Sequence, residues 1–185
     1  MKNTIIALVF CSALALAALT QAAQLPASPS VENELSARAS NVSEITLDKD
    51  KLKLASSFMN GHGDAATSKL IEGLEGIYIR DYEFNKEGDY SANQVEQLRK
   101  YYETGGWTPV VRDQDRKTGE LSEIMVKLVN DKPGGLFILD VEPKEISIVL
   151  ILGPVGMEAM SKLGNIISFA TMSQAKAVPQ SNNNR

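Results

Sequence analysis

One short stretch of the chain carries the residues best suited to chemistry. Tyr78, Arg80 and Tyr82 alternate there with Asp81 and Glu83. Successive side chains of a β-strand point to opposite faces, so the tyrosines and the arginine would share one face and the two acids the other. A cation stacked with aromatic rings can form part of a binding site, and two carboxylates in different environments can run acid–base chemistry. Tyr78, Arg80 and Tyr82 are therefore the candidate binding residues.

The same stretch supports an enzymatic alternative, a small hydrolase or isomerase that uses Asp81, Glu83 and Arg80. Exposed acids on a strand are more often solvated or paired with a cation than catalytic. Ile77 and Ile79 fall on the face of the acids, so the two faces of the strand are not cleanly sorted. A β-bulge near Arg80 would sort them, and we predict one there.

Other catalytic arrangements lack the residues they need. His62 is the only histidine, which leaves no two-histidine metal site and no helical HExxH pair. It lies between Gly61 and Gly63, a setting typical of an exposed loop, and no Gly-x-Ser-x-Gly elbow or Gly-Lys-Ser/Thr phosphate loop occurs. We therefore expect no catalytic residue, no metal site and no cofactor, and the sequence favours a protein that is not an enzyme.

The N-terminus has the pattern of a signal peptide. Lys2 gives a positive start, residues 4–19 form an uncharged and mostly apolar run, and Thr20 and Ala22 stand at the −3 and −1 positions of a cleavage site. The run is short for a membrane-spanning helix, although an uncleaved anchor is an alternative. Phe10 precedes Cys11 where a lipoprotein signal needs a small residue, so we expect no lipid anchor. The protein should be exported to a periplasmic or secreted destination, with membrane contact only through the signal peptide.

Cleavage would remove Cys11, the only cysteine, and Lys2. The mature chain would then have no disulfide and no thiol chemistry. The full sequence has 19 basic and 23 acidic residues; the loss of one lysine leaves 18 against 23, a net charge of −5. No basic cluster is present to neutralise phosphates, which argues against a nucleic-acid partner.

Composition divides the chain into four parts. Residues 1–22 are the signal peptide, residues 23–45 are rich in Ser, Ala and Asn and are predicted to be a disordered tether, and residues 176–185 are predicted to be a disordered tail. The remaining residues, 46–175, suit one domain with one core.

Within this domain the hydrophobic period changes at each predicted element. Helices are predicted around 52–59, 65–74 and 92–104, the last with Ser91 and Gln94 as a capping box, and a closing helix carries Met157, Met160, Leu163 and Ile167. Strands are predicted at 77–84, 107–112, 122–130, 136–141 and 146–152, with the last one central because it is apolar on both faces. Short turns join the later strands, including one at 131–135, which makes those strands antiparallel neighbours.

The predicted fold is α+β, an antiparallel sheet of about five strands with helices packed on one face. After the leading helices, the order of one strand, a helix, four strands and a helix resembles the topology of TATA-box-binding-like domains. This analogy concerns topology alone and implies no DNA binding.

Several segments together resemble a known family. They are Lys53–Met59, Leu74–Phe84, Gly106–Val111 and Glu142–Ile146. In order and spacing they are similar to those of bacterial exported proteins grouped as domain of unknown function 4252, over residues from about 50 to 165. The resemblance implies a secreted or envelope-attached bacterial domain, and the family brings no catalytic residue to transfer.

Three functions remain open at the level of sequence. The first is a non-catalytic interaction module that engages an envelope protein through a sheet edge or through the face with Tyr78, Arg80 and Tyr82. The second is the hydrolase or isomerase described above. The third is a carrier for an apolar ligand held between sheet and helices.

Overall fold

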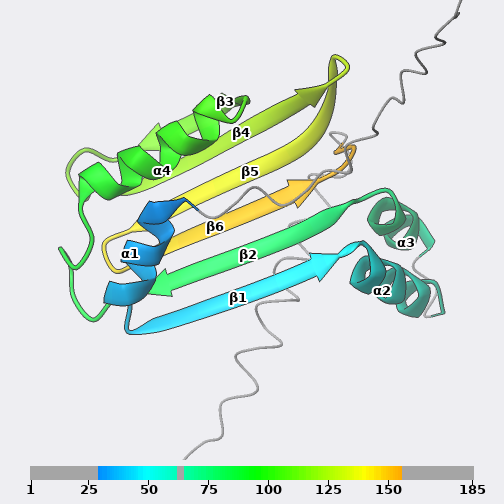
Figure 1. The fold of residues 1–185 in the computed structure, drawn as a ribbon, viewed down its shortest axis with the longest axis horizontal. Helices are drawn as coiled ribbons and strands as arrows, with labels where there is room; N and C mark the ends of the chain where they lie inside the picture. The colour runs from blue at the N-terminus through cyan, green and yellow to red at the C-terminus, as the bar shows by residue number, and fades with distance from the viewer. Residues whose placement is uncertain (1–28, 62–64, 156–185) are drawn as a thin grey trace, which may run out of the picture.

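Six strands form one antiparallel sheet in the computed structural model, which describes residues 29–61 and 65–155. The strands are β1 (Asn41–Asp48), β2 (Gly76–Glu83), β3 (Trp107–Gln114), β4 (Leu121–Val129), β5 (Lys132–Glu142) and β6 (Glu145–Leu152), in the spatial order β1-β2-β6-β5-β4-β3 (Figure 1). This confirms the predicted α+β antiparallel fold, with six strands where about five were expected. β6 has a neighbour on each side, as its apolar sequence predicted.

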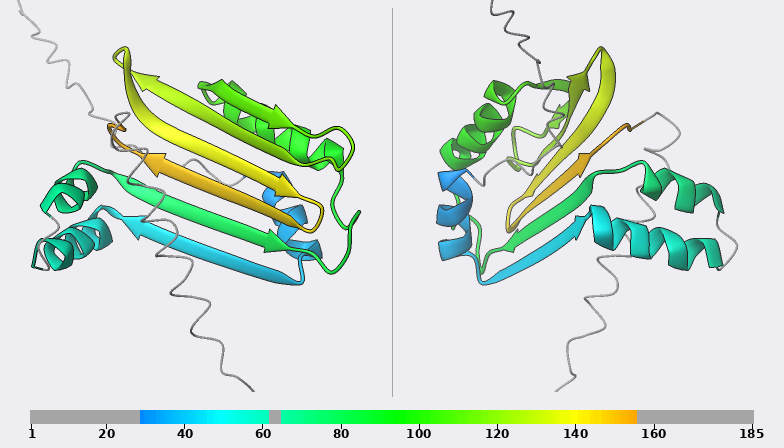
Figure 2. Two further views of the ribbon diagram at one scale, coloured as in Figure 1. Left: turned by 180° about the vertical axis from the view of Figure 1, so that it is seen from behind. Right: turned by 45° about the vertical axis from the view of Figure 1, so that its right-hand side comes forward.

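Among the described residues, four helices accompany the sheet. They are α1 (Ser30–Arg38), α2 (Lys49–Gly61), α3 (Ala65–Glu72) and α4 (Ala92–Thr104). Figures 1 and 2 show α1 and α4 side by side on one face, called here the first face, and α2 and α3 beyond the end of β1 and β2. The opposite side of the sheet is called the second face.

α4 begins where its capping residues predict. The Ser91 hydroxyl accepts a hydrogen bond from the Gln94 amide at 3.3 Å, and the Gln94 side chain accepts one from the Ser91 amide at 3.0 Å. Val95, Leu98 and Tyr102 are buried along one side of the helix, at the spacing of an amphipathic helix. The helix is thereby anchored to the first face of the sheet.

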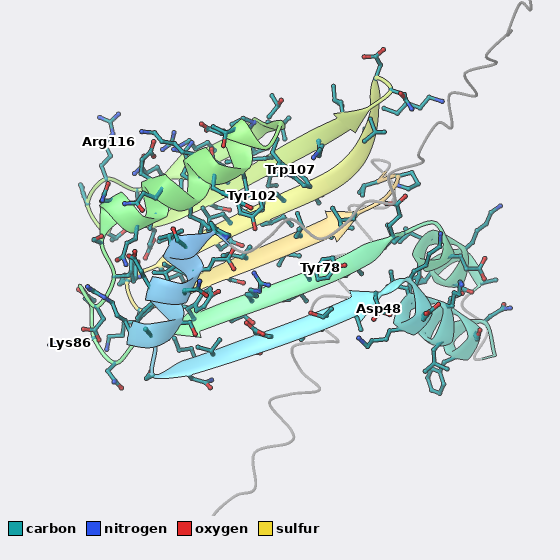
Figure 3. The ribbon with its side chains drawn as sticks, in the orientation of Figure 1. Asp48, Tyr78, Lys86, Tyr102, Trp107 and Arg116 are labelled. Carbon is teal, nitrogen blue, oxygen red and sulfur yellow. The ribbon has the colours of Figure 1, made fainter. Side chains whose placement is uncertain are left out.

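Aromatic rings fill the core between α4 and the sheet. Tyr102 stacks on Phe137 with ring centroids 3.9 Å apart, and Trp107 meets Tyr102 edge to face (Figure 3). The Trp107 ring lies against Gly135, where an added Cβ would come within 2.7 Å of it. A glycine is therefore required at 135 so that the ring can approach the backbone of β5.

The turn between β4 and β5 is tighter than predicted. Asn130 and Asp131 both have positive φ, at 51° and 59°, as a two-residue hairpin turn requires. Val129 pairs with Lys132, so Pro133, Gly134 and Gly135 lie in β5 and not in the turn predicted at 131–135. That prediction was wrong because Pro and Gly mark strand ends and strand irregularities as readily as turns.

Two further predictions were wrong. Residues 30–45, assigned to a disordered tether, form α1 and most of β1. The bulge predicted near Arg80 is absent, because β2 pairs residue by residue with β1 and with β6 along its whole length. Ile77 and Ile79 share a face with the acids because this end of β2 is buried on both sides. The sheet has its bulges elsewhere, at Pro109–Val111 and at Lys127–Leu128.

Some predictions lie outside the described residues. They are the signal peptide at 1–22, the tether at 23–28, the loop around His62, the closing helix at 157–167 and the tail at 176–185.

Candidate functional site

The predicted binding residues Tyr78, Arg80 and Tyr82 lie together on the first face. α1 lies over this part of the sheet (Figure 1). It brings Glu32, which is 2% exposed, onto Arg80. The guanidinium of Arg80 donates to the Glu32 carboxylate, and the hydroxyl of Tyr82 donates to the same carboxylate at 3.3 Å. Tyr102 of α4 donates to its other oxygen at 3.4 Å. One buried carboxylate thus ties α1, β2 and α4 together.

Electrostatics at this cluster reflect burial beside a charge. Burial raises the pKa of Tyr82, and the negative charge of Glu32 raises it further. The pKa of Tyr102 is raised for the same two reasons. Burial alone would lower the pKa of Arg80, but the Glu32 carboxylate outweighs burial and the pKa lies above its usual value. The phenols of Tyr82 and Tyr102 therefore stay neutral at neutral pH beside the ion pair of Arg80 and Glu32. Tyr82 is only 2% exposed.

A second buried ion pair holds α4. Arg99 donates two hydrogen bonds to Glu123 of β4, which is fully buried, and it also contacts Glu96 and Glu103 on its own helix at 2.6 and 3.1 Å. The hydrogen bonds that Arg99 donates to Glu123 are the main cause that raises the pKa of Arg99. The charges of Arg80 and Arg99 on the first face are thus both neutralised by buried carboxylates of the protein itself.

The second face carries a row of alternating Ser and Asp across all six strands. Directly paired residues of antiparallel strands lie on the same face, and the register places the following residues in one line. They are Ser43, Asp81, Ser147, Asp140, Ser122 and Asp113, from β1 to β3. Ser147 donates to Asp81 and Ser122 donates to Asp140, each at 2.6 Å. Hairpin register could have revealed part of this row: the tight turn at 143–144 pairs Glu142 with Glu145, and Asp140 must then face Ser147.

A row of acids lies beside it. Glu83, Glu145 and Glu142 are direct cross-strand neighbours on β2, β6 and β5. Burial raises the pKa of Glu145, and the charges of Asp81, Glu142 and Glu83 raise it further. Like charges placed opposite each other are destabilising, so this row is a local strain in the sheet.

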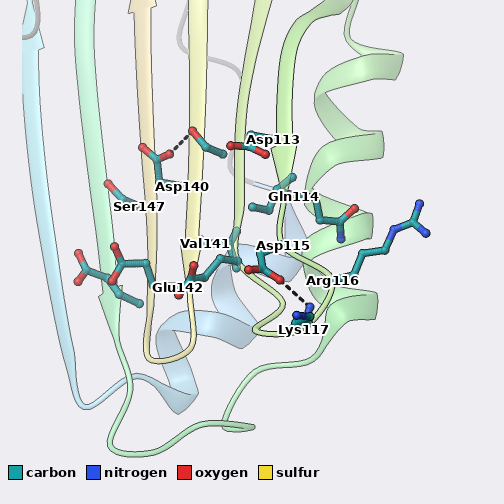
Figure 4. Close-up of a pocket in the computed structure, with 13 residues that line it drawn as sticks. Asp113, Gln114, Asp115, Arg116, Lys117, Asp140, Val141, Glu142 and Ser147 are labelled. Carbon is teal, nitrogen blue, oxygen red and sulfur yellow. Dashed lines mark hydrogen bonds between the residues drawn. The ribbon is translucent and has the colours of Figure 1, made fainter.

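An open groove of about 1010 Å³ runs over this acidic end of the second face (Figure 4). Asp140, Glu142 and Ser147 line it from the sheet, and the β3–β4 loop brings Asp115, Arg116 and Lys117. Asp115 accepts hydrogen bonds from the backbone amides of Lys117 and Thr118, which folds the loop back at the mouth of the groove. Among the described residues, no group of three or more His, Cys, Asp and Glu is arranged to hold a metal ion.

The structure does not bring together the three residues of the enzymatic alternative. Asp81 and Glu83 reach the acidic end of the second face, while Arg80 lies on the first face beneath α1. Sequence reasoning missed Glu32 as the partner of Arg80, 48 positions away along the chain. The available signal was the pair Val31 and Leu35, one helical turn apart, which are both buried against the sheet.

A family model matches residues 36–163, which is more than half of the chain. It is described as domain of unknown function (DUF4252). The chain belongs to the DUF4252 family. The matched range includes the whole of β1, in agreement with the structure and beyond the limit near residue 50 expected from sequence. No curated protein and no solved structure matches the chain. In the part of this DUF4252 protein that the structure describes, no helix has the length and apolar character needed to cross a membrane.

Proposed function

We propose that the protein is exported and acts as a non-catalytic interaction module of the bacterial cell envelope, which binds a partner protein by adding a strand to β3. This proposal rests on the unpaired and exposed edge of β3. It is an edge strand that pairs only with β4 among the described elements, and seven of its eight residues are exposed. An extended segment of a partner can form main-chain hydrogen bonds with such an edge.

The two edges of the sheet differ. β1, at the other edge, is partly buried along most of its length, and α2 follows it directly. On β3, Val110 and Val111 are 57% and 51% exposed, which offers an incoming strand apolar contacts as well as hydrogen bonds. Pro109 and the bulge beside it limit pairing at the start of β3, as natural edge strands often do. The part after Pro109 is therefore the proposed binding segment.

The side chains of the first face are engaged inside the protein, which argues against both catalysis and partner binding there. Arg80, the charged group predicted for binding there, is held in an internal ion pair, and so is Arg99 of α4. A ligand could reach Tyr82 only by displacing α1, since this side chain is 2% exposed. We therefore assign recognition to the edge of the sheet and not to the face with Tyr78, Arg80 and Tyr82.

Recovery of partners from envelope extracts tests the proposal. A Val110→Lys, Val111→Lys variant places charges on the β3 edge and should lose the specific partner that the wild-type protein recovers. A Leu128→Lys, Val129→Lys variant is the matched control, because these residues have the same exposures, 57% and 51%, at the end of β4. The control should keep the partner. Equal recovery by both variants would exclude β3 as the binding edge.

Export is tested separately. We expect the protein in the periplasm or the medium, with Ala23 as its first residue after cleavage behind Ala22. N-terminal sequencing of the recovered protein checks this, and a chain that still begins at Met1 in the cytosol would contradict it.

A further inference from the structure

The second face of the sheet has an apolar half at the end where α2 and α3 lie. Two cross-strand rows make it up. The outer row is Leu47, Ile77, Ile151, Leu136 and Val126, and the inner row is Ile45, Ile79, Val149, Ile138, Ile124 and Val111. The row of alternating Ser and Asp comes next along the strands. An apolar surface of this extent in an exported protein needs a covering element or a partner.

The α2–α3 hairpin covers one corner of this half. Leu52, Ile71 and Leu74 pack into one cluster with Ile77 and Ile151. The views in Figure 2 show the hairpin at the end of β1 and β2, with no described helix over β4 and β5 on this face. Ile124, Val126 and Ile138 of those strands are only partly buried, whereas Leu136 of β5 is buried. The described helices therefore leave the β4–β5 side of the apolar half without a helical cover.

The chain leaves the described part of the structure at this place. After β6, the amide of Gly153 donates to the carbonyl of Gly134 at 3.0 Å, and the amide of Val155 donates to that of Pro133 at 3.4 Å. Both bonds hold the outgoing chain beside the start of β5. Val155 is 5% exposed and belongs to the cluster of the second face. Val155, the last described residue, therefore lies on the second face beside the start of β5, and residues 156–185 follow it in the sequence.

The sequence that follows has the pattern such a cover needs. Met157, Met160, Leu163 and Ile167 repeat at helical spacing, and Glu158 and Lys162 are the only charged residues between 156 and 175. We propose that residues 157–167 form a helix that lies across the strands on the apolar half of the second face, with this stripe against Ile124, Val126 and Ile138.

The dimensions agree with this placement. Eleven helical residues extend about 16 Å, and four neighbouring strands span about 14 Å at their usual spacing of about 4.8 Å. The two apolar rows lie two residues apart along each strand, a separation of about 7 Å, so one helix about 10 Å wide covers both. The row of Ser and Asp then stays outside the helix, and the acidic groove remains open to solvent.

A spin label tests the position directly. In the full chain with Cys11→Ser, a nitroxide on Lys162→Cys lies off the apolar stripe and leaves the packing intact. We expect paramagnetic broadening of backbone amides in β4 and β5 around Ile124 and Ile138, and little broadening in α1, on the other side of the sheet. Broadening that spares β4 and β5 would overturn the proposal.

Substitutions in the full chain give the second test. A Met160→Asp, Leu163→Asp variant should expose the apolar half, increase binding of an apolar dye several-fold and lower the melting temperature by about 5 °C. The matched control, Ser161→Asp and Asn165→Asp, adds the same charges between the stripe residues and should change neither. Equal effects of the two variants would overturn the proposal. It would also be overturned if the wild-type protein bound the dye as strongly as the stripe variant does. A wild-type dimer dissociated by the stripe variant would assign the face to a second copy.

Discussion

Arg99 keeps three carboxylate partners although its side chain is only 6% exposed, which makes its pair with the fully buried Glu123 the most enclosed charge interaction in the described part of the chain. Removal of Glu123 takes away the one fully buried partner of Arg99 and leaves only the more exposed Glu96 and Glu103, which costs far more than the loss of a surface pair. Glu123→Gln should therefore lower the free energy of unfolding by about 3 kcal/mol. Urea denaturation measures this loss.

The control for this prediction lies on the same helix. Lys100 is 3.7 Å from Glu96 and its side chain is 68% exposed, so Lys100→Ala should cost about 0.5 kcal/mol or less. If Glu123→Gln changed stability as little as Lys100→Ala does, the buried pair would not be a support of α4.

Glu145, in contrast, lowers the free energy of unfolding at neutral pH. It faces Glu83 and Glu142 directly, and burial together with Asp81, Glu142 and Glu83 raises its pKa. A raised pKa means that the folded state binds this proton more tightly than the unfolded state, so the stability it gives is present at acidic pH and is lost as the pH rises through the raised pKa. Glu145→Gln should raise the free energy of unfolding at pH 7 by about 0.5 kcal/mol. Urea denaturation at pH 4 and pH 7 should show this gain chiefly at pH 7, and a gain independent of pH would refute the electrostatic cause.

At the level of elements, α4 depends on its reciprocal cap. Ser91→Ala removes the side-chain acceptor for the Gln94 amide and should cost about 1 kcal/mol. Ser91→Asp keeps an acceptor at the same place and is the matched control, with a loss well below that of Ser91→Ala. Thermal unfolding followed by circular dichroism compares the two. Equal losses would show that the serine acts through something other than its cap.

The elements that sequence predicted correctly are those specified by neighbours in the chain. α4 has its cap within four residues, and the turn between β5 and β6 fixes the pairing of Glu142 with Glu145. α1 and β1 were missed because their partners are remote: Glu32 contacts Arg80, and β1 pairs with β2 across two intervening helices. The apolar residues of β1 are also not confined to one face of the strand: Val42 lies on the first face of the sheet, and Ile45 and Leu47 lie on the second face. Local patterns carry no information about such contacts.

The candidate site shows the same limit. Alternation along β2 correctly separated Arg80 from the two acids, because it follows from strand geometry alone. The cover of α1 over Tyr82 and the row of Ser and Asp across six strands arise from sheet order and register. The sequence reveals register only for strands that are joined by tight turns, and it does not reveal the order of the other strands.

At the scale of the whole molecule, the sheet joins the two ends of the described chain. β1, the first strand, pairs with β2, and β2 pairs with β6, the last strand. α1 then closes the first face over β2 and contacts α4, so residues 30–38 support the core and are not part of a tether. The domain that folds as a unit therefore begins near residue 30 and not near residue 46.

Native digestion with trypsin tests this boundary. Arg38 is exposed, but it ends a helix whose following residues are bonded to the fold: Ala39 donates to the Leu35 carbonyl at 2.9 Å, and Ser40 donates to the Glu83 carbonyl at 2.7 Å. Cleavage after Arg38 needs local unfolding of this segment, whereas Arg116 and Lys117 stand in the exposed β3–β4 loop and serve as the internal control. We expect mass spectrometry to show cleavage in the loop first, while α1 stays attached to β1. Early release of a fragment that begins at Ala39 would instead show that residues 30–38 are a tether and not part of the folded domain.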